Sequence, residues 1–180
     1  EAVKYAQLAI EFREKGNSSR KDLLAQSYAA LARGYVLQAK MTEAIEFNTK
    51  ALEIRRAVFG EYHPEVAESY NELSIIYSRY DPQKALDLEK RAFAIWKHVY
   101  GENHIEVATG YSNLSQRYQD LAQYDKAIEY VKKALNISLA LLGEVHPHVA
   151  TAYCNLGTLY QDTGDYEKAI EYGNKSLGIN

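Results

Sequence analysis

The sequence predicts an all-α protein built as a solenoid, in which antiparallel helix pairs stack along one direction. Three observations lead to this prediction. Gly60, Gly101 and Gly143 recur at intervals of 41 and 42 residues, and each is followed three residues later by histidine. Between these glycines, apolar residues are spaced three and four apart, as on one face of a helix. The chain contains only 3 prolines in 180 residues, and few prolines favour helices. A period of this length is typical of stacked helical repeats.

The first half of each repeat predicts one helix. Its copies read SSRKDLLAQSYAALARGY, GEYHPEVAESYNELSIIY, GENHIEVATGYSNLSQRY and GEVHPHVATAYCNLGTLY. In the first copy, apolar residues at 25, 28, 31, 32 and 35 form one stripe. Gly143 suits a left-handed residue at the end of the preceding helix, and Pro147 suits the first turn of the next.

The second half predicts the partner helix, in the copies EAIEFNTKALEIRRAVFG, KALDLEKRAFAIWKHVYG and KAIEYVKKALNISLALLG. The second copy lacks one residue in the turn, where Asp81 is expected to cap a helix that begins at Pro82. We expect residues 1–17 to form the second helix of a preceding repeat. Repeats over 18–60, 61–101, 102–143 and 144–180 follow, the last truncated at its C-terminal end.

The spacing within each pair resembles the tetratricopeptide repeat (TPR). Its marks in the first copy are Tyr28, Leu31, Ala32, Tyr35, Ala44 and Ala51, and they recur from Tyr70, Tyr111 and Tyr153. The 42-residue period, with G-x-x-H-P-x-V-A and N-L, is similar to the kinesin light chain subtype. The resemblance covers the whole chain. It implies a right-handed superhelical solenoid whose first helices line a concave groove that binds a peptide or a partner protein.

The histidines and the single cysteine do not form a plausible catalytic or metal site. His63, His104 and His146 occupy one place per repeat, roughly 10 Å apart at the spacing of packed helices, which is too far to share a metal. We expect them to cap helices, and we expect His148 to be a surface residue. Cys154 lies eight residues from His146, about 12 Å along a helix, which is too far for a nucleophile and its base. A buried or groove-facing thiol is expected, with no metal and no cofactor.

Composition restricts the partners and the compartment. A net charge of -3 disfavours nucleic acid and anionic membranes. The sixteen tyrosines are explained by packing, since eight of them stand at the ends of first helices. One cysteine, no signal peptide and no membrane-spanning run favour a cytoplasmic protein. Because the first residue is not Met, we expect the chain to be a segment cut from a longer protein or a processed product. Glycosylation is not expected at the N-x-S sequences of Asn17, Asn113, Asn136 and Asn174.

Residues that vary between copies form a second stripe on the first helices. A recurring stripe packs against neighbours, whereas a varying polar stripe is free to bind. The resemblance places it in the ligand groove, with Asn113 and Asn155 matching the family's backbone-binding Asn and with Ala30 and Glu72 at the equivalent places. The candidate groove residues are Arg33, Asn71, Arg79, Thr109, Ser112, Asn113, Gln116, Thr151, Asn155, Thr158 and Gln161.

The expected function is therefore a non-catalytic scaffold that binds an extended peptide or partner segment. Arg33 and Arg79 near one end, against Asp120 and Asp162 near the other, suggest a peptide with an acidic and a basic end. One alternative is a regulatory or autoinhibitory segment of a larger sensor or motor-adaptor protein. An enzyme is disfavoured, because no set of titratable residues converges outside the repeat pattern. Self-association through exposed terminal helices is a further possibility.

Overall fold

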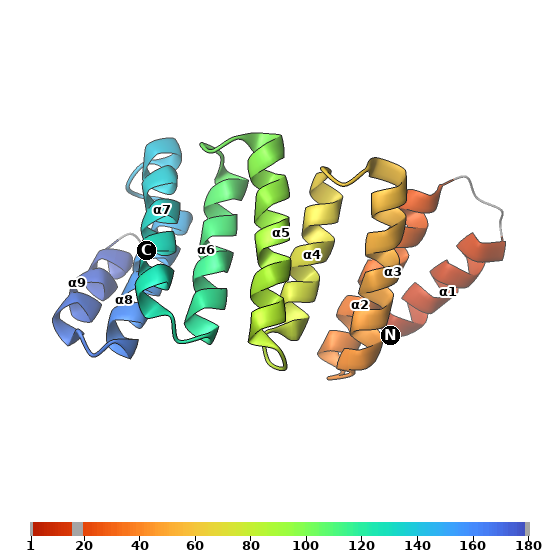
Figure 1. Cartoon of the computed structure of the whole chain (residues 1–180), viewed down its shortest axis with the longest axis horizontal. Coiled ribbons are helices and arrows are strands. Elements are labelled where there is room, and N and C mark those ends of the chain that lie inside the picture. Colours follow the sequence, from red (N-terminus) through yellow and green to blue (C-terminus); the bar gives the residue numbers. More distant parts are fainter. Residues whose placement is uncertain (1, 16–19, 179–180) are drawn as a thin grey trace. The chain divides into compact units, whose positions relative to one another are not determined.

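The computed structural model describes residues 2–15 and 20–178, and the expectation about Asn17 lies outside them. Every regular element in these two ranges is an α-helix (Figure 1). Two compact units divide the chain, Glu1–Ile95 and Trp96–Asn180. None of the described helices is long and apolar enough to span a membrane. The prediction of an all-α protein is confirmed.

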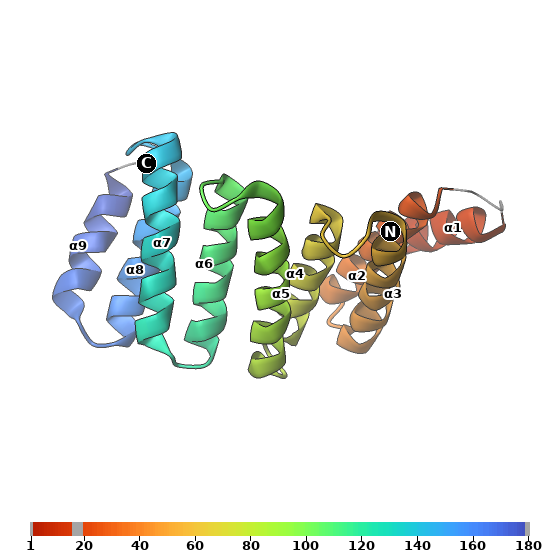
Figure 2. The same ribbon diagram turned by 45° about the horizontal axis from the view of Figure 1, so that its top comes forward.

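The first unit contains α1 (Ala2–Lys15), α2 (Lys21–Leu37), α3 (Met41–Phe59), α4 (Pro64–Tyr77) and most of α5 (Pro82–Tyr100). Helix α2 packs against both α1 and α3, and α3 packs against α4. Both views show α2 and α3 side by side (Figures 1 and 2). A turn of three residues joins them, so the pair is antiparallel.

The second unit contains α6 (Ile105–Asp120), α7 (Tyr124–Leu142), α8 (Pro147–Asp162) and α9 (Tyr166–Leu177). Helix α7 packs against α6 on one side and α8 on the other, and α8 packs against α9. Each pair again consists of a first and a second helix joined by a short turn. The alternation predicted from the two halves of the repeat is therefore present in both units.

Helix starts use the residues expected to cap them. The Nδ1 atoms of His63, His104 and His146 each accept a hydrogen bond of 3.2 Å from the backbone N–H two residues later. Asp81 Oδ1 accepts from the N–H of Lys84 at 3.0 Å, and α5 begins at Pro82. These bonds satisfy amide groups that have no partner within the helix. The predicted capping roles are confirmed.

The glycines that end second helices adopt a more restricted conformation than expected. Gly60 has φ 84° and ψ 171°, and Gly143 has φ 79° and ψ 177°. The positive φ agrees with the prediction, but the extended ψ lies outside the left-handed helical region. This combination is essentially limited to glycine. The chain leaves each helix in an extended direction and enters the next capped helix three residues later.

The recurring stripe forms the core, as the periodicity predicts. Leu31 is 1% exposed and Leu156 is fully buried, and Ala32, Ala44 and Ala51 are also fully buried. Small residues at these places let neighbouring helices approach closely. The approach is closest at Gly157, where an added Cβ would lie only 3.3 Å from the carbonyl oxygen of Ala169 on α9.

Tyrosines stack between the two helices of a pair. A second-helix aromatic ring lies between two first-helix tyrosines, with ring centroids 5.2–6.0 Å apart, in the trios Tyr28–Phe47–Tyr35, Tyr111–Tyr130–Tyr118 and Tyr153–Tyr172–Tyr160. Lysine ammonium groups lie over several of these rings, as Lys50 does 4.7 Å from the centroid of Phe47, which is favourable. The rings are thus used in packing, which supports the structural explanation of the tyrosine excess.

Candidate functional site

The candidate groove residues are accessible to a ligand in both units. Apart from Arg79, they lie on α2 and α4 in the first unit and on α6 and α8 in the second. The exposed ones are Arg33, Arg79, Gln116, Thr151, Thr158 and Gln161. The half-buried ones are Asn71, Thr109, Ser112, Asn113 and Asn155.

Two members of the varying stripe are placed differently from the pattern. Helix α4 ends at Tyr77, so Arg79 lies in the turn that follows and not on the helix. This helix has 14 residues where α6 and α8 have 16, in the repeat that lacks one residue. Ala29, which occupies the place on α2 that Asn71 has on α4 and Ser112 has on α6, is fully buried in a cluster with Ala6 and Ile10 of α1. The varying stripe is therefore not exposed along its whole length.

A pocket of about 420 Å³ opens between α2 and α4 of the first unit. Its apolar wall includes Val36, Leu37, Ile75 and Ile76. Leu37 is 86% exposed and Ile75 is 53% exposed. Apolar side chains that gather at a concave surface are typical of binding sites. The candidate residues predicted from the sequence do not include these four, although Val36, Leu37 and Ile75 occupy varying positions on the first helices, and this was the available signal.

A polar cluster forms one side of this pocket. Arg33 Nη1 lies 2.6 Å from Glu72 Oε1, and Asn48 Nδ2 donates to Glu72 Oε2 at 2.7 Å. Asn48 is 1% exposed, and its Oδ1 atom has no hydrogen-bond partner among the described residues. Glu72 stands where the later repeats carry Asn113 and Asn155, so here a carboxylate joins α2, α3 and α4.

A second carboxylate of the pocket, Glu68, has an altered protonation equilibrium. Partial burial against the pocket raises its pKa, and the neighbouring Glu72 carboxylate adds to the effect. Arg55 and Arg33 act in the opposite direction. The pocket therefore disfavours additional negative charge beside Glu68.

In the second unit, the stripe carries a chain of amide hydrogen bonds. Gln116 Nε2 donates to Gln119 Oε1 at 3.3 Å and to Asp120 Oδ1 at 3.2 Å. Gln119 Nε2 donates to Asp162 Oδ2 at 2.6 Å and so connects α6 with α8. The side chains of Asn155 and Gln161 make no hydrogen bond with the described residues. They offer free donors and acceptors to a ligand.

The hydroxyl groups of the stripe are already engaged as donors. Each donates to the carbonyl oxygen four residues earlier in its own helix, at 2.9–3.2 Å, in Thr109, Ser112, Thr151 and Thr158. Their remaining lone pairs can only accept. We therefore expect these residues to receive N–H groups of a ligand and not to donate to its carbonyls.

The charged residues of the stripe are mostly paired within their own unit. Arg33 pairs with Glu72, and Asp120 lies 3.2 Å from Arg117. Arg79 is exposed and makes no ion pair with the described residues. The pairing weakens the expectation that opposite charges select a peptide with one acidic and one basic end.

The histidines and Cys154 are not arranged as a metal site. The capping bonds occupy Nδ1 of His63, His104 and His146. Within the described residues, no group of three or more His, Cys, Asp and Glu side chains could hold a metal ion. Cys154 is a free, exposed thiol on α8.

Comparison with known proteins agrees with this geometry. A family model for the tetratricopeptide repeat matches residues 23–98, 81–140 and 106–180. BtubC (BKLC) from P. vanneervenii is similar in structure, with a TM-score of 0.85 and 27% sequence identity over 98% of this chain and 70% of that chain. No match was found among curated proteins.

Two further solved structures share the fold. A candidate kinesin light chain from Podosopora anserina with nearly identical TPR-like repeats has a TM-score of 0.82 and 23% identity, over 98% of this chain and 84% of that chain. The apo form of RapI has a TM-score of 0.80 and 17% identity, over 98% of this chain and 47% of that chain. With the match of the family model over most of the sequence, the chain belongs to the tetratricopeptide repeat family.

Proposed function

We propose that this protein is a non-catalytic scaffold that binds an extended peptide or partner segment along its first helices. The observation that carries the proposal is the pocket between α2 and α4, which combines an exposed apolar wall with a polar cluster. Its volume of about 420 Å³ falls in the range of ligand-binding pockets. A stacked array also holds such a surface rigid before binding, which lowers the entropy lost on association.

The pocket favours a neutral, apolar side chain of the ligand. Leu37 and Ile75 would gain burial on contact, at about 25 cal/mol per Å² of apolar surface removed from water. The raised pKa of Glu68 shows that negative charge is already unfavourable there. An acidic side chain would add a further like charge, so we expect aspartate and glutamate to be excluded from this position.

The stripe of the second unit, taken by itself, would hold a peptide through its backbone. Asn155 and Gln161 present free amide groups, and the threonine hydroxyls present acceptors. Such groups pair with the N–H and C=O groups that any extended peptide carries. This arrangement would bind peptides with little dependence on their sequence, whereas the pocket of the first unit would select the side chain.

A random peptide library, presented to the purified protein, tests the proposal. Peptides selected by the wild type are expected to share an aliphatic residue. Ile75→Asp is expected to lower the affinity for these peptides at least tenfold, or about 1.4 kcal/mol. Fluorescence polarisation measures this affinity. Val58→Asp is the matched control, since Val58 is 43% exposed on α3 of the same unit and does not line the pocket. Equal loss in both variants, or selection of no peptide, would contradict the proposal.

The alternative is a regulatory or autoinhibitory segment of a larger sensor or motor-adaptor protein. There, the same surface would hold another part of the parent chain. Library peptides would then bind the isolated repeats but not the full-length parent, until the competing segment was removed. Both functions are non-catalytic, and neither needs a cofactor.

The remaining expectations about partners and compartment stay predictions. A net charge of -3 gives little electrostatic attraction for nucleic acid, and we expect no insertion into a membrane. The single cysteine suits the reducing cytoplasm. Self-association through the terminal helices would appear as a concentration-dependent mass in sedimentation.

A further inference from the structure

The pocket between α2 and α4 carries one carboxylate that has no cationic partner. Helix α4 contains three glutamates. Glu65 Oε2 lies 2.9 Å from Arg55 Nη2, and Glu72 Oε1 lies 2.6 Å from Arg33 Nη1. The third, Glu68, lines the pocket, and its side chain makes no ion pair and no hydrogen bond with the described residues. Both arginines near the pocket are therefore already paired, and Glu68 is left for an external partner.

The Glu68 carboxylate is accessible to a ligand and is also partly desolvated. The residue is exposed, but its contact with the pocket removes part of its hydration. This desolvation raises the pKa of Glu68, and the Glu72 carboxylate adds to the effect. Desolvating a charge without a partner costs free energy, and a cation beside the carboxylate offsets this cost. A positive group of a ligand would therefore be stabilised at this point of the pocket.

Comparison of the repeats shows that packing does not require a charge at this position. The equivalent residues on α2, α6 and α8 are Gln26, Thr109 and Thr151, and none of them is charged. Helices with these residues pack in the same alternating order as α4. The carboxylate of Glu68 is thus a property of this pocket and not of the repeat.

Asn48 adds a second acceptor to the polar side of the pocket. Its Nδ2 donates to Glu72, and because an ionised carboxylate only accepts hydrogen bonds, this contact fixes the orientation of the amide. The Oδ1 atom is left without a partner among the described residues, although Asn48 is 1% exposed and lines the pocket. The unpaired polar atoms of Glu68 and Asn48 are therefore all acceptors. A ligand that complements them supplies donors.

The distance between Glu68 and the apolar wall limits the spacing of groups in the ligand. Glu68 lies seven residues before Ile75 on α4, which is about 10 Å along the helix. An extended peptide advances about 3.3 Å per residue, so two ligand residues up to three positions apart can reach both points. Lysine and arginine suit the edge of an apolar pocket, because the stem of each packs on apolar surface while its charged end stays accessible.

We propose that the peptide bound in this pocket carries a lysine or arginine within three residues of its aliphatic side chain, and that this cation pairs with Glu68. The inference rests on the proposed function, since it names a second determinant of the same ligand. Charge complementarity supports it. The pocket is lined by one arginine, Arg33, and by two glutamates, Glu68 and Glu72, so one ligand cation balances the charge.

The test is a synthetic peptide library with a fixed central leucine and random residues at the three positions on either side. Selection on the wild-type protein is expected to enrich lysine and arginine about threefold over the unselected library, as an accessible ion pair allows. Glu68→Gln is expected to abolish this enrichment without removing the dependence on leucine. Glu68→Lys is expected to enrich aspartate and glutamate instead.

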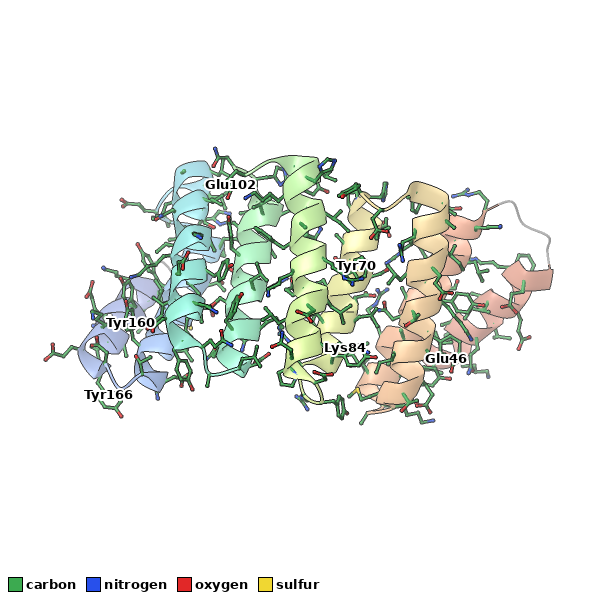
Figure 3. All side chains as sticks on the ribbon, in the orientation of Figure 1. Glu46, Tyr70, Lys84, Glu102, Tyr160 and Tyr166 are labelled. Atoms are coloured by element: carbon green, nitrogen blue, oxygen red, sulfur yellow. The ribbon has the colours of Figure 1, made fainter. Side chains whose placement is uncertain are left out.

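A matched control removes a carboxylate of the same unit that does not line the pocket. Glu46, labelled in Figure 3 on α3, has a side chain that is 57% exposed. Glu46→Gln lowers the charge of the unit as much as Glu68→Gln does, and it is expected to keep the enrichment of basic residues. Thermal unfolding followed by circular dichroism checks that each variant is folded.

The possible outcomes separate this inference from the proposed function. Equal enrichment of basic residues by the wild type and by Glu68→Gln would overturn the inference, because the cation would then bind elsewhere. Leucine-dependent binding without any enrichment of basic residues would overturn the inference and leave the proposed function in place. Selection of no peptide by the wild type would overturn both.

Discussion

Among the described turns between first and second helices, three hold a residue at positive φ, and only one of the three uses glycine. Gly164 has φ 80°, whereas Ala39 and Ala122 have φ 57° and 54°. A side chain with a Cβ is strained there by about 1–2 kcal/mol. The turns are otherwise similar, so the alanines are local sites of stored strain.

Replacing one of these alanines is expected to stabilise the protein. Ala122→Gly should raise the free energy of unfolding by about 0.5 kcal/mol, because the relieved strain exceeds the roughly 0.4–1 kcal/mol by which glycine favours the unfolded chain. Gly143→Ala is the opposite control and should lower it by about 1–3 kcal/mol, although nothing lies within 4 Å of its added Cβ. Urea denaturation measures both. A stabilising Gly143→Ala would contradict the assigned backbone conformation.

The raised pKa of Tyr28 predicts that the protein loses stability in alkaline solution. Burial raises its pKa to about 12, and the hydrogen bond of 2.6 Å to Glu14 adds to the shift. Between about pH 10 and 12, the unfolded chain loses this proton while the folded protein retains it, so the stability contribution present below pH 10 disappears. The urea midpoint should fall less steeply over this window in Tyr28→Phe than in the wild type. An equally steep fall of the urea midpoint with pH in both proteins would show that Tyr28 does not contribute to this loss of stability.

At the scale of the helix, the Asp81 side chain caps the start of α5 and contributes to its stability. Asp81→Ala is expected to lower the free energy of unfolding by about 1 kcal/mol, because the N–H of Lys84 loses its acceptor. Asp81→Asn should retain most of the stability, since asparagine caps equally well. Thermal unfolding followed by circular dichroism compares the three proteins. An equal loss in both variants would indicate that the negative charge matters and the cap geometry does not.

Helix order and helix starts could be predicted because they depend on residues close in sequence. His63 caps through the N–H of Glu65, and Asp81 caps through that of Lys84. Because the capping histidine recurs in successive repeats, the start of each of these helices could be predicted. The end of α4 could not be placed the same way, because the shortened repeat changes where the turn begins, and Arg79 lies outside the helix as a result.

The candidate site could be predicted only in part. Periodicity identified which face of the first helices is accessible, and this needs no tertiary information. The pocket beside Leu37 and Ile75 depends on how α2, α3 and α4 meet. Its ion pair joins Arg33 to Glu72, 39 residues apart. Whether a polar side chain on the stripe is free or paired therefore follows from the neighbouring helix, which the pattern of one repeat does not contain.

At the scale of the whole molecule, each unit is held together by contacts between consecutive helices. In the second unit α6 packs with α7, α7 with α8, and α8 with α9. Stability in such arrays is approximately a sum of terms for each repeat and each interface. A helix with two neighbours is thus held more strongly than a helix with one.

Leu135 and Leu177 test this rule at equivalent positions of α7 and α9. Leu135 is 8% exposed between two neighbours, whereas Leu177 is 71% exposed with one. Leu135→Ala is expected to lower the free energy of unfolding by about 2–5 kcal/mol, and Leu177→Ala by about 0.5 kcal/mol or less. In hydrogen exchange, amides of α9 should exchange before those of α7, because a helix without buried side chains opens without disrupting the core. The outcome that would contradict this rule is equal protection of α7 and α9 from hydrogen exchange, together with similar losses of unfolding free energy in the two variants. It would mean that a further contact covers α9 in solution.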